Sequence, residues 1–177
     1  MHAIEKGNIK IVKELIRGGA DVNRESSDEY HTPLTMAIEL DNIAIVEELI
    51  RGGANVNDEG GYGYETPLIT AISNIEILKV LISAGADVNY VKEEDDDIDD
   101  DIDEDEDIED IEDEDIDDED IEDRRGDSPL IIASRLGNIE IVKELLHSGA
   151  NIYHVNKHGD CAISIAHNNK VRAEILK

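Results

Sequence analysis

The chain has 177 residues, a length that fits roughly one domain of ordinary size. It is strongly acidic, with 45 Asp and Glu residues against 16 Lys and Arg and a formal net charge of −29. It contains no Trp, no Phe and 27 Ile, so any core has to be built from aliphatic side chains packed between short elements. An acidic chain without a basic stripe is repelled by phosphate backbones, which excludes nucleic acid as a direct ligand.

Cysteine content and hydropathy indicate where in the cell the protein is located. The one cysteine, Cys161, excludes an intramolecular disulfide, and the first thirty residues lack an apolar stretch behind a basic start. No apolar run approaches the roughly 20 residues that a membrane span needs. We therefore expect an intracellular protein, cytoplasmic or nuclear, that is neither secreted nor bound to a membrane.

The first predicted helix pair lies within residues 1–23. Residues 9–16 place apolar side chains at positions 9, 12 and 16 and at 11 and 15, three or four residues apart, which is typical of an amphipathic helix. Gly19 follows, where the end of a helix favours a left-handed residue. The stretch before this helix is short, and Ala3 stands where longer units end their first helix. The chain begins either with a half unit that caps an array or as a piece of a longer array.

The second and third predicted pairs have a complete first helix. Thr32-Pro33 and Thr66-Pro67 each predict an N-cap hydroxyl followed by proline at the first helical position. A short turn that contains asparagine and a second amphipathic helix follow in both units. The third unit has lost two residues at the turn between its helices.

An acidic segment then interrupts the pattern from Glu93 to Asp123. It holds 25 acidic residues and six Ile in 31 positions, with an Ile spacing that fits neither a helix nor a strand. Like charges at i, i+4 cost a helix about 0.2–0.5 kcal/mol per pair, so we expect the segment to be disordered. Three interpretations stay open: a solvated loop without a selected role, electrostatic capture of a basic partner such as a histone-like protein, or weak binding of divalent cations.

The fourth and fifth predicted pairs follow the acidic segment. Ser128-Pro129-Leu130 begins the fourth pair, and Cys161-Ala162-Ile163 is a degraded copy of the same motif 33 residues later. The last unit is incomplete.

A five-residue motif that begins with Gly-Ala follows the second helix of a unit, and its recurrence gives the length of the repeat. Its spacings are 34, 32 and 64 residues, and removing the 31 acidic positions from the last spacing leaves 33. The acidic segment is therefore an insertion. We predict repeats 1–3 in residues 1–90, the insertion in 91–125, and repeats 4 and 5 in 126–177. The motif copies are Gly19-Ala20-Asp21-Val22-Asn23, Gly53-Ala54-Asn55-Val56-Asn57, Gly85-Ala86-Asp87-Val88-Asn89 and the weaker Gly149-Ala150-Asn151-Ile152-Tyr153.

A 33-residue unit with these motifs resembles the ankyrin repeat. The resemblance implies an all-α solenoid of about five repeats, the first and last incomplete, whose units are joined by hairpin loops beside a concave binding face. It also implies a non-enzymatic, monomeric scaffold that binds a protein partner. The Ile and Asn richness is similar to that of ankyrin-repeat proteins of large DNA viruses of amoebae, which would place the protein in a host-cell cytoplasm, although AT-rich coding gives the same bias.

The tyrosines are the candidate binding residues. All five lie in segments between units, and tyrosine is favoured at interface hot spots. The other interpretation is the general preference of tyrosine for strands and turns. A second hypothesis for function is an acidic chaperone or decoy, in which Glu93 to Asp123 binds basic proteins. The candidates are Tyr30, Tyr62, Tyr64, Tyr90 and Tyr153.

The resemblance implies one possible modification. Asn23, Asn57 and Asn89 each follow a leucine by eight residues, a pattern similar to the one hydroxylated in many ankyrin proteins. The alternative is that these side chains bond to the backbone of the loops.

The sequence predicts no active site, metal or cofactor. His154, His158 and Cys161 lack a fourth ligand at a suitable spacing. Residues 61–64 are expected to form a flexible loop, because no strand precedes them as a phosphate-binding loop requires. No Ser, His and Asp set indicates a catalytic triad.

Overall fold

The computed structural model of the protein describes residues 1–26, 31–58, 66–91 and 126–177. Within these residues the chain forms helices and turns and no strand. The all-α class predicted from the sequence is therefore confirmed for the described residues. Of the insertion predicted at residues 91–125, residues 92–125 lie outside them.

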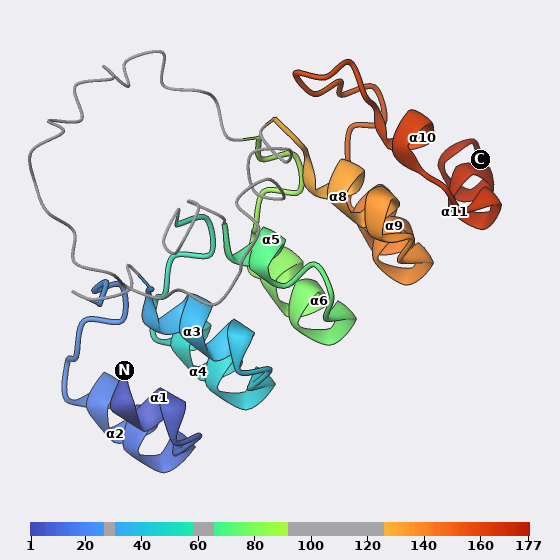
Figure 1. Ribbon diagram of the computed structural model, residues 1–177. Coiled ribbons are helices and arrows are strands. Elements are labelled where there is room, and N and C mark those ends of the chain that lie inside the picture. The colour runs from blue at the N-terminus through green and yellow to red at the C-terminus, as the bar shows by residue number, and fades with distance from the viewer. Residues whose placement is uncertain (27–30, 59–65, 92–125) are drawn as a thin grey trace, which may run out of the picture.

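Five helix pairs follow one another in the described residues and stack into an elongated array with the two chain ends at opposite ends (Figure 1). The pairs are α1 (His2–Glu5) with α2 (Ile9–Arg17), α3 (Pro33–Glu39) with α4 (Ile43–Arg51), α5 (Pro67–Thr70) with α6 (Ile75–Ser83), α8 (Pro129–Leu136) with α9 (Ile139–His147), and α10 (Ala162–Ile165) with α11 (Asn169–Ile175).

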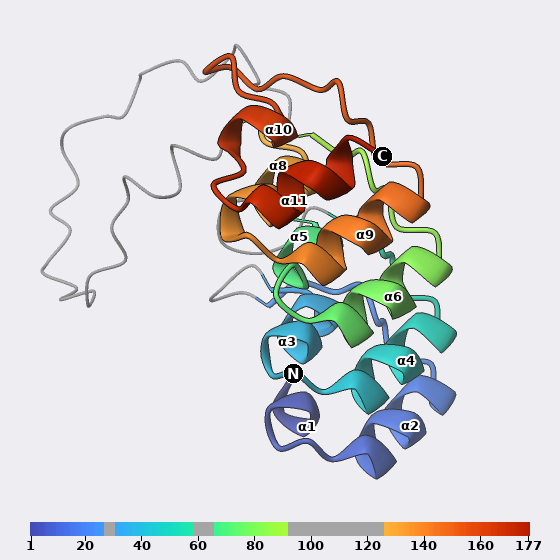
Figure 2. The same ribbon diagram turned by 90° about the vertical axis from the view of Figure 1, so that its right-hand side faces the viewer.

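The helices form two layers, with the first helices of the pairs in one and the second helices in the other (Figure 2). Each second helix packs on the second helix of the next pair, and α6 contacts α9 directly. The third and fourth units are thus neighbours in space although the insertion separates them in the chain.

The first helices begin as the sequence predicts, with one exception. The Thr32 hydroxyl accepts from the Thr35 N–H at 3.2 Å, and the Ser128 hydroxyl accepts from the Ile131 N–H at 3.4 Å. The Thr66 hydroxyl is buried and forms no hydrogen bond among the described residues, so the prediction of a side-chain cap at Thr66 is wrong. The α5 helix is only four residues long and begins without that bond.

The second helices share a cap that the sequence analysis treated only as a turn. In the first four units the carboxamide oxygen of an asparagine accepts from the backbone N–H three residues later, and the fifth unit uses the N–H two residues later. Asparagine is among the best residues at this position. The five caps are Asn8, Asn42, Asn74, Asn138 and Asn168.

The core runs along the array between the two helix layers. It is aliphatic throughout, and the first-helix leucines Leu34, Leu68 and Leu130 are each 1% exposed. In the first four units a glycine with left-handed backbone stands two residues after the end of the second helix, for example Gly53 at φ 94° and Gly85 at φ 97°. The α10 helix is four residues long, like α5, because the fifth unit has also lost residues between its helices.

Candidate functional site

Asparagine side chains join consecutive units along the loop edge of the array. The Asn23 carboxamide donates to the Gly53 carbonyl at 3.2 Å and accepts from the Asn55 N–H at 2.8 Å. Asn57 makes the same two bonds to Gly85 and Asp87, at 3.2 and 2.8 Å. Each asparagine thus pairs two backbone groups of the next unit. We call these side chains and the bonds they make the asparagine ladder.

The asparagine ladder continues across the insertion. The Asn89 carboxamide donates to the Gly149 carbonyl at 3.2 Å and accepts from the Asn151 N–H at 2.7 Å. These partners lie 60 and 62 residues away in the sequence, yet the geometry matches that of the two earlier rungs. The loop edge is therefore one continuous surface from the first unit to the fourth. At the next position Tyr153 replaces asparagine.

The ladder bears on the predicted modification. Asn23, Asn57 and Asn89 bond to loop backbone, as the alternative interpretation expects, but the backbone belongs to the following unit. Both polar ends of each side chain are engaged. Hydroxylation at these residues stays a prediction.

A buried carboxylate fixes the loop between the fourth and fifth units. The Asp127 side chain is fully buried and accepts from the Arg135 guanidinium and the Asn156 carboxamide, both at 2.6 Å. Asn156 in turn accepts from the His158 and Asp160 N–H groups, which closes the turn at residues 156–160. The fourth unit therefore holds residues 153–160 in a defined position on its surface.

The described tyrosines differ in exposure. Tyr153 is 82% exposed at the loop edge, while Tyr90 is half-buried and packs against the core. Tyr30, Tyr62 and Tyr64 lie outside the described residues. Of the two described tyrosines, Tyr153 is thus the one whose side chain is open to solvent, and a binding role for the tyrosines stays a prediction.

Exposed apolar residues missed by the sequence analysis lie on the first helices and the last loop. Leu40 is 49% exposed and Leu136 is 54% exposed, and each stands eight residues after its N-cap, at the end of α3 and of α8. The α5 helix between them ends at Thr70. Val155, near Tyr153, is 53% exposed. The two leucines have the same position relative to their N-caps, and this repetition is the feature of the sequence that could have identified them.

The candidate metal ligands are used structurally. The His154 ring nitrogen lies 2.7 Å from the Gly126 carbonyl, and no cluster of three His, Cys, Asp or Glu residues able to hold a metal occurs among the described residues. Hydrogen bonding from the Ser164 backbone and side chain lowers the pKa of the Cys161 thiol below its ordinary value. Cys161 precedes α10, where the second to fourth units have Thr or Ser.

Comparison with known families agrees with this architecture. A model of ankyrin repeats in three copies matches residues 1–92, and a model of a single ankyrin repeat matches residues 125–157. No curated protein matches the sequence. The fold and its repeated loop edge define a repeat protein of the helical solenoid class, and the chain belongs to the ankyrin-repeat family.

Membership of this family fixes a coarse function. Ankyrin repeats are generally protein–protein interaction modules, and proteins of the family are typically non-enzymatic scaffolds. Among the described residues, no helix is long and apolar enough to cross a membrane.

Proposed function

We propose that this chain binds a protein partner through the loop edge and the ends of its first helices. The observation that carries the proposal is a division of labour along the array. The repeated leucines pack in the core and the repeated asparagines bond consecutive units to each other. The side chains of four other residues are exposed to solvent: Tyr153, Val155, Leu40 and Leu136. Exposed aromatic and aliphatic side chains on a rigid scaffold supply contact area at small entropic cost.

The loop that carries Tyr153 is suited to this role because its backbone is fixed. The buried Asp127 carboxylate and the bonds to Asn156 hold the turn that follows Tyr153. A side chain presented from an ordered loop loses less entropy on binding than one on a loose loop. The sequence predicts Tyr62 and Tyr64 as further binding residues, and both lie outside the described residues.

A second candidate function uses the acidic insertion as the binding element. Between Glu93 and Asp123 the sequence holds 25 carboxylates and no Lys or Arg. A polyanion attracts basic proteins at long range, so the insertion would act as a chaperone or decoy for them, with the solenoid as its carrier.

Affinity capture with the full chain separates the two functions. We compare the wild type with Y62A/Y64A, with Y153S/L136S, and with a chain in which a third of the carboxylates in residues 93–123 become Asn or Gln. K79A/E140A is the matched control, because both side chains are exposed on the second-helix layer. Binding by the loop edge predicts loss in the tyrosine and leucine variants, retention in the other two, and little change between low and high salt.

Binding by the acidic segment predicts the opposite pattern. The carboxylate variant loses its partner, the tyrosine variants keep it, and the affinity for polylysine falls steeply as salt shortens the Debye length from about 10 Å at 0.1 M toward 3 Å at 1 M. A partner that survives every substitution at high salt contradicts both functions.

A further inference from the structure

The turns between paired helices differ in length along the array. Because the two helices of a pair run in opposite directions, these turns lie at the edge opposite the loops between units (Figure 1). In the second unit the asparagine cap Asn42 stands ten positions after the N-cap Thr32, and the fourth unit has the same spacing. In the third unit, from Thr66 to Asn74, the spacing is eight. The third unit is thus two residues shorter at this edge than the units on either side of it.

A leucine stands at the end of both longer first helices. Leu40 and Leu136 each lie two positions before the asparagine cap and are half exposed, whereas Ile72 at that position of the third unit is buried. Ile43, which follows the cap of the second unit, is also exposed. Exposed apolar side chains with polar residues around them mark surfaces that bind other proteins. The second and fourth units therefore offer two apolar contact points with the short third unit between them.

Acidic side chains surround these apolar points. Residues 38–44, 71–77 and 134–140 form the surface that we call the turn edge, and they contain one basic residue, Arg135. The Arg135 guanidinium bonds to the buried Asp127 carboxylate at 2.6 Å, so its charge is already matched. The turn edge is therefore negative. Its acidic residues, all exposed, are Glu39, Asp41, Glu76 and Glu140.

Two of these carboxylates have polar neighbours within the array. The Glu39 carboxylate lies 3.3 Å from the His31 ring, and the Asp41 carboxylate accepts from the Asn74 carboxamide of the next unit at 2.8 Å. An amide carries no charge, so the bond does not neutralise Asp41. The Asn74 oxygen also caps α6 by accepting from the Ile77 N–H, so the second turn is fixed to the third unit. The turn edge is thus a defined surface that keeps its negative charge.

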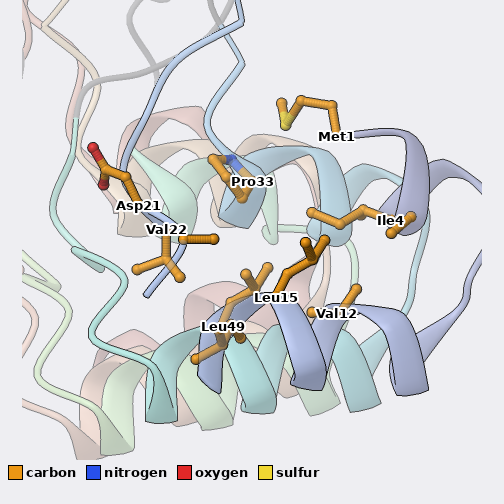
Figure 3. A pocket seen from close by; sticks show the side chains of 11 residues that line it. Met1, Ile4, Val12, Leu15, Asp21, Val22, Pro33 and Leu49 are labelled. Atoms are coloured by element: carbon orange, nitrogen blue, oxygen red, sulfur yellow. The ribbon is translucent and has the colours of Figure 1, made fainter. Parts of the chain in front are cut away.

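The cavity between the first two units does not offer a comparable site (Figure 3). Its volume is about 70 Å³, whereas ligand pockets measure roughly 300–1,000 Å³. Its lining comes from α1, α2 and the loop after α2, with Pro33 and Leu49 from the second unit, and includes no residue of the turn edge. A partner of the turn edge therefore binds on an exposed surface.

We propose that the turn edge binds a basic amphipathic helix of a protein partner, with one apolar side chain of that helix on Leu40 and another on Leu136. Lys or Arg side chains beside them pair with the carboxylates of the turn edge. The proposal rests on the proposed function and names the chemistry of its partner. A basic partner is attracted to a chain of net charge −29, whereas a second copy of this chain is repelled.

The spacing of the two leucines favours a helix as the bound element. Neighbouring helices pack about 8–10 Å apart, so two junctions separate Leu40 from Leu136 by about 16–20 Å. A helix covers about 16 Å in eleven residues at a rise of about 1.5 Å per residue. Eleven residues also complete about three turns of 3.6 residues, which returns to the same face. Two apolar side chains eleven residues apart can therefore reach both leucines at once.

The test uses two peptides of about sixteen Lys, Ala and Leu residues and the full chain. The matched peptide has two leucines eleven residues apart, and the control peptide has the same composition with its leucines nine residues apart, on opposite faces of the helix. Titration of the matched peptide should shift the methyl resonances of Leu40, Ile43 and Leu136 and reach saturation. The control peptide should bind these residues about tenfold more weakly or less, because it can bury one leucine at a time.

Substitutions in the full chain localise the contact. L40S/L136S should weaken the matched peptide about tenfold or more, whereas V155S should leave it unchanged, because Val155 is an exposed apolar residue of the loop edge. E76K should weaken binding severalfold at about 0.1 M salt. E47K makes the same change of charge on the exposed Glu47 of α4, outside the turn edge, and should have little effect. Circular dichroism checks that each chain keeps its helix content.

Three results would overturn the proposal. The first is equal affinity of the two peptides, and the second is binding that L40S/L136S leaves intact. The third is a set of shifts confined to the isoleucine methyls of residues 93–123, which would mean electrostatic capture by the acidic segment alone. Affinity capture of the protein partner tests the proposed function separately. If Y153S/L136S abolishes that capture while the matched peptide fails to bind, the proposed function stands and the basic helix is the wrong partner.

Discussion

At the scale of single residues, the asparagines that end the first three repeats join the backbones of neighbouring units by paired hydrogen bonds, although no strands are present among the described residues. Each of Asn23, Asn57 and Asn89 pairs one carbonyl and one N–H of the next unit. These side chains are exposed, so water competes for them, and a net hydrogen bond in proteins is worth about 0.5–1.5 kcal/mol. The rung is therefore a moderate contribution that is repeated at the first three junctions.

We predict that N57A lowers the free energy of unfolding by about 1–3 kcal/mol, since two bonds are lost and the Gly85 carbonyl and Asp87 N–H lose their partner. Urea denaturation followed by circular dichroism measures the change. N57D is the informative companion, because its carboxylate can still accept from Asp87 but cannot donate to Gly85. K79A serves as the control, and an N57A chain as stable as K79A would contradict a stabilising rung.

The buried Asp127 carboxylate predicts a larger and more local effect. D127A removes the acceptor of both Arg135 and Asn156, and removing one partner of a buried pair costs about 3–5 kcal/mol. Because the Arg135 side chain keeps 27% exposure, we expect a loss of about 2–4 kcal/mol. Hydrogen exchange should place the loss in α10 and α11 and leave α3 and α4 unchanged. Equal acceleration in both regions would argue against a local anchor.

At the scale of elements, the sequence predicts the helices well because their signals are local. The amphipathic run at residues 9–16 corresponds to α2 at Ile9–Arg17, and Thr32-Pro33 begins α3 as the N-cap rule requires. The sequence also indicates that the fifth unit is shortened between its helices. Fewer residues separate Ala166 from Asn168 than separate Ala37 from Asn42. That signal was missed, although the matching loss in the third unit was found.

Features that depend on distant neighbours could not be predicted in this way. The bond between Asn89 and Asn151 joins residues 62 positions apart, and the Asp127 network joins two units. The hydroxyl of Thr66 has the right position for a cap but forms no bond, which only the packed structure reveals. Exposure of Tyr153 and burial of Tyr90 likewise depend on packing that a residue type does not specify.

The direct contact of α6 with α9 leads to a prediction about the insertion. Deleting residues 93–123 should leave the helical fold intact and change the melting midpoint by no more than a few degrees, because neither that contact nor the Asn89 rung uses the deleted residues. Removing 25 carboxylates also relieves self-repulsion at low salt. Thermal denaturation of both chains at two salt concentrations measures this. A midpoint that falls clearly at both concentrations would show that the segment stabilises the array.

At the scale of the whole molecule, stability comes from a row of similar junctions. In a solenoid each unit contacts only its neighbours, so units in the middle have two junctions and units at the ends have one. The first and last units also leave more of their apolar side chains exposed. Ile11 and Leu15 are half exposed in the first unit, and Leu176 is 71% exposed in the last.

We therefore predict that amide exchange is fastest at α1, α2, α10 and α11 and slowest at α4, α6 and α9. The central helices bury Val46, Leu78 and Val142 completely, so opening there breaks two junctions, whereas fraying at an end breaks one. Exchange measured by mass spectrometry on the full chain gives the profile along the array. The D127A chain supplies the internal comparison, because it should steepen the gradient on the C-terminal side alone. Uniform protection from Met1 to Lys177 would mean that the array opens as one cooperative body, and the nearest-neighbour account of its stability would then fail.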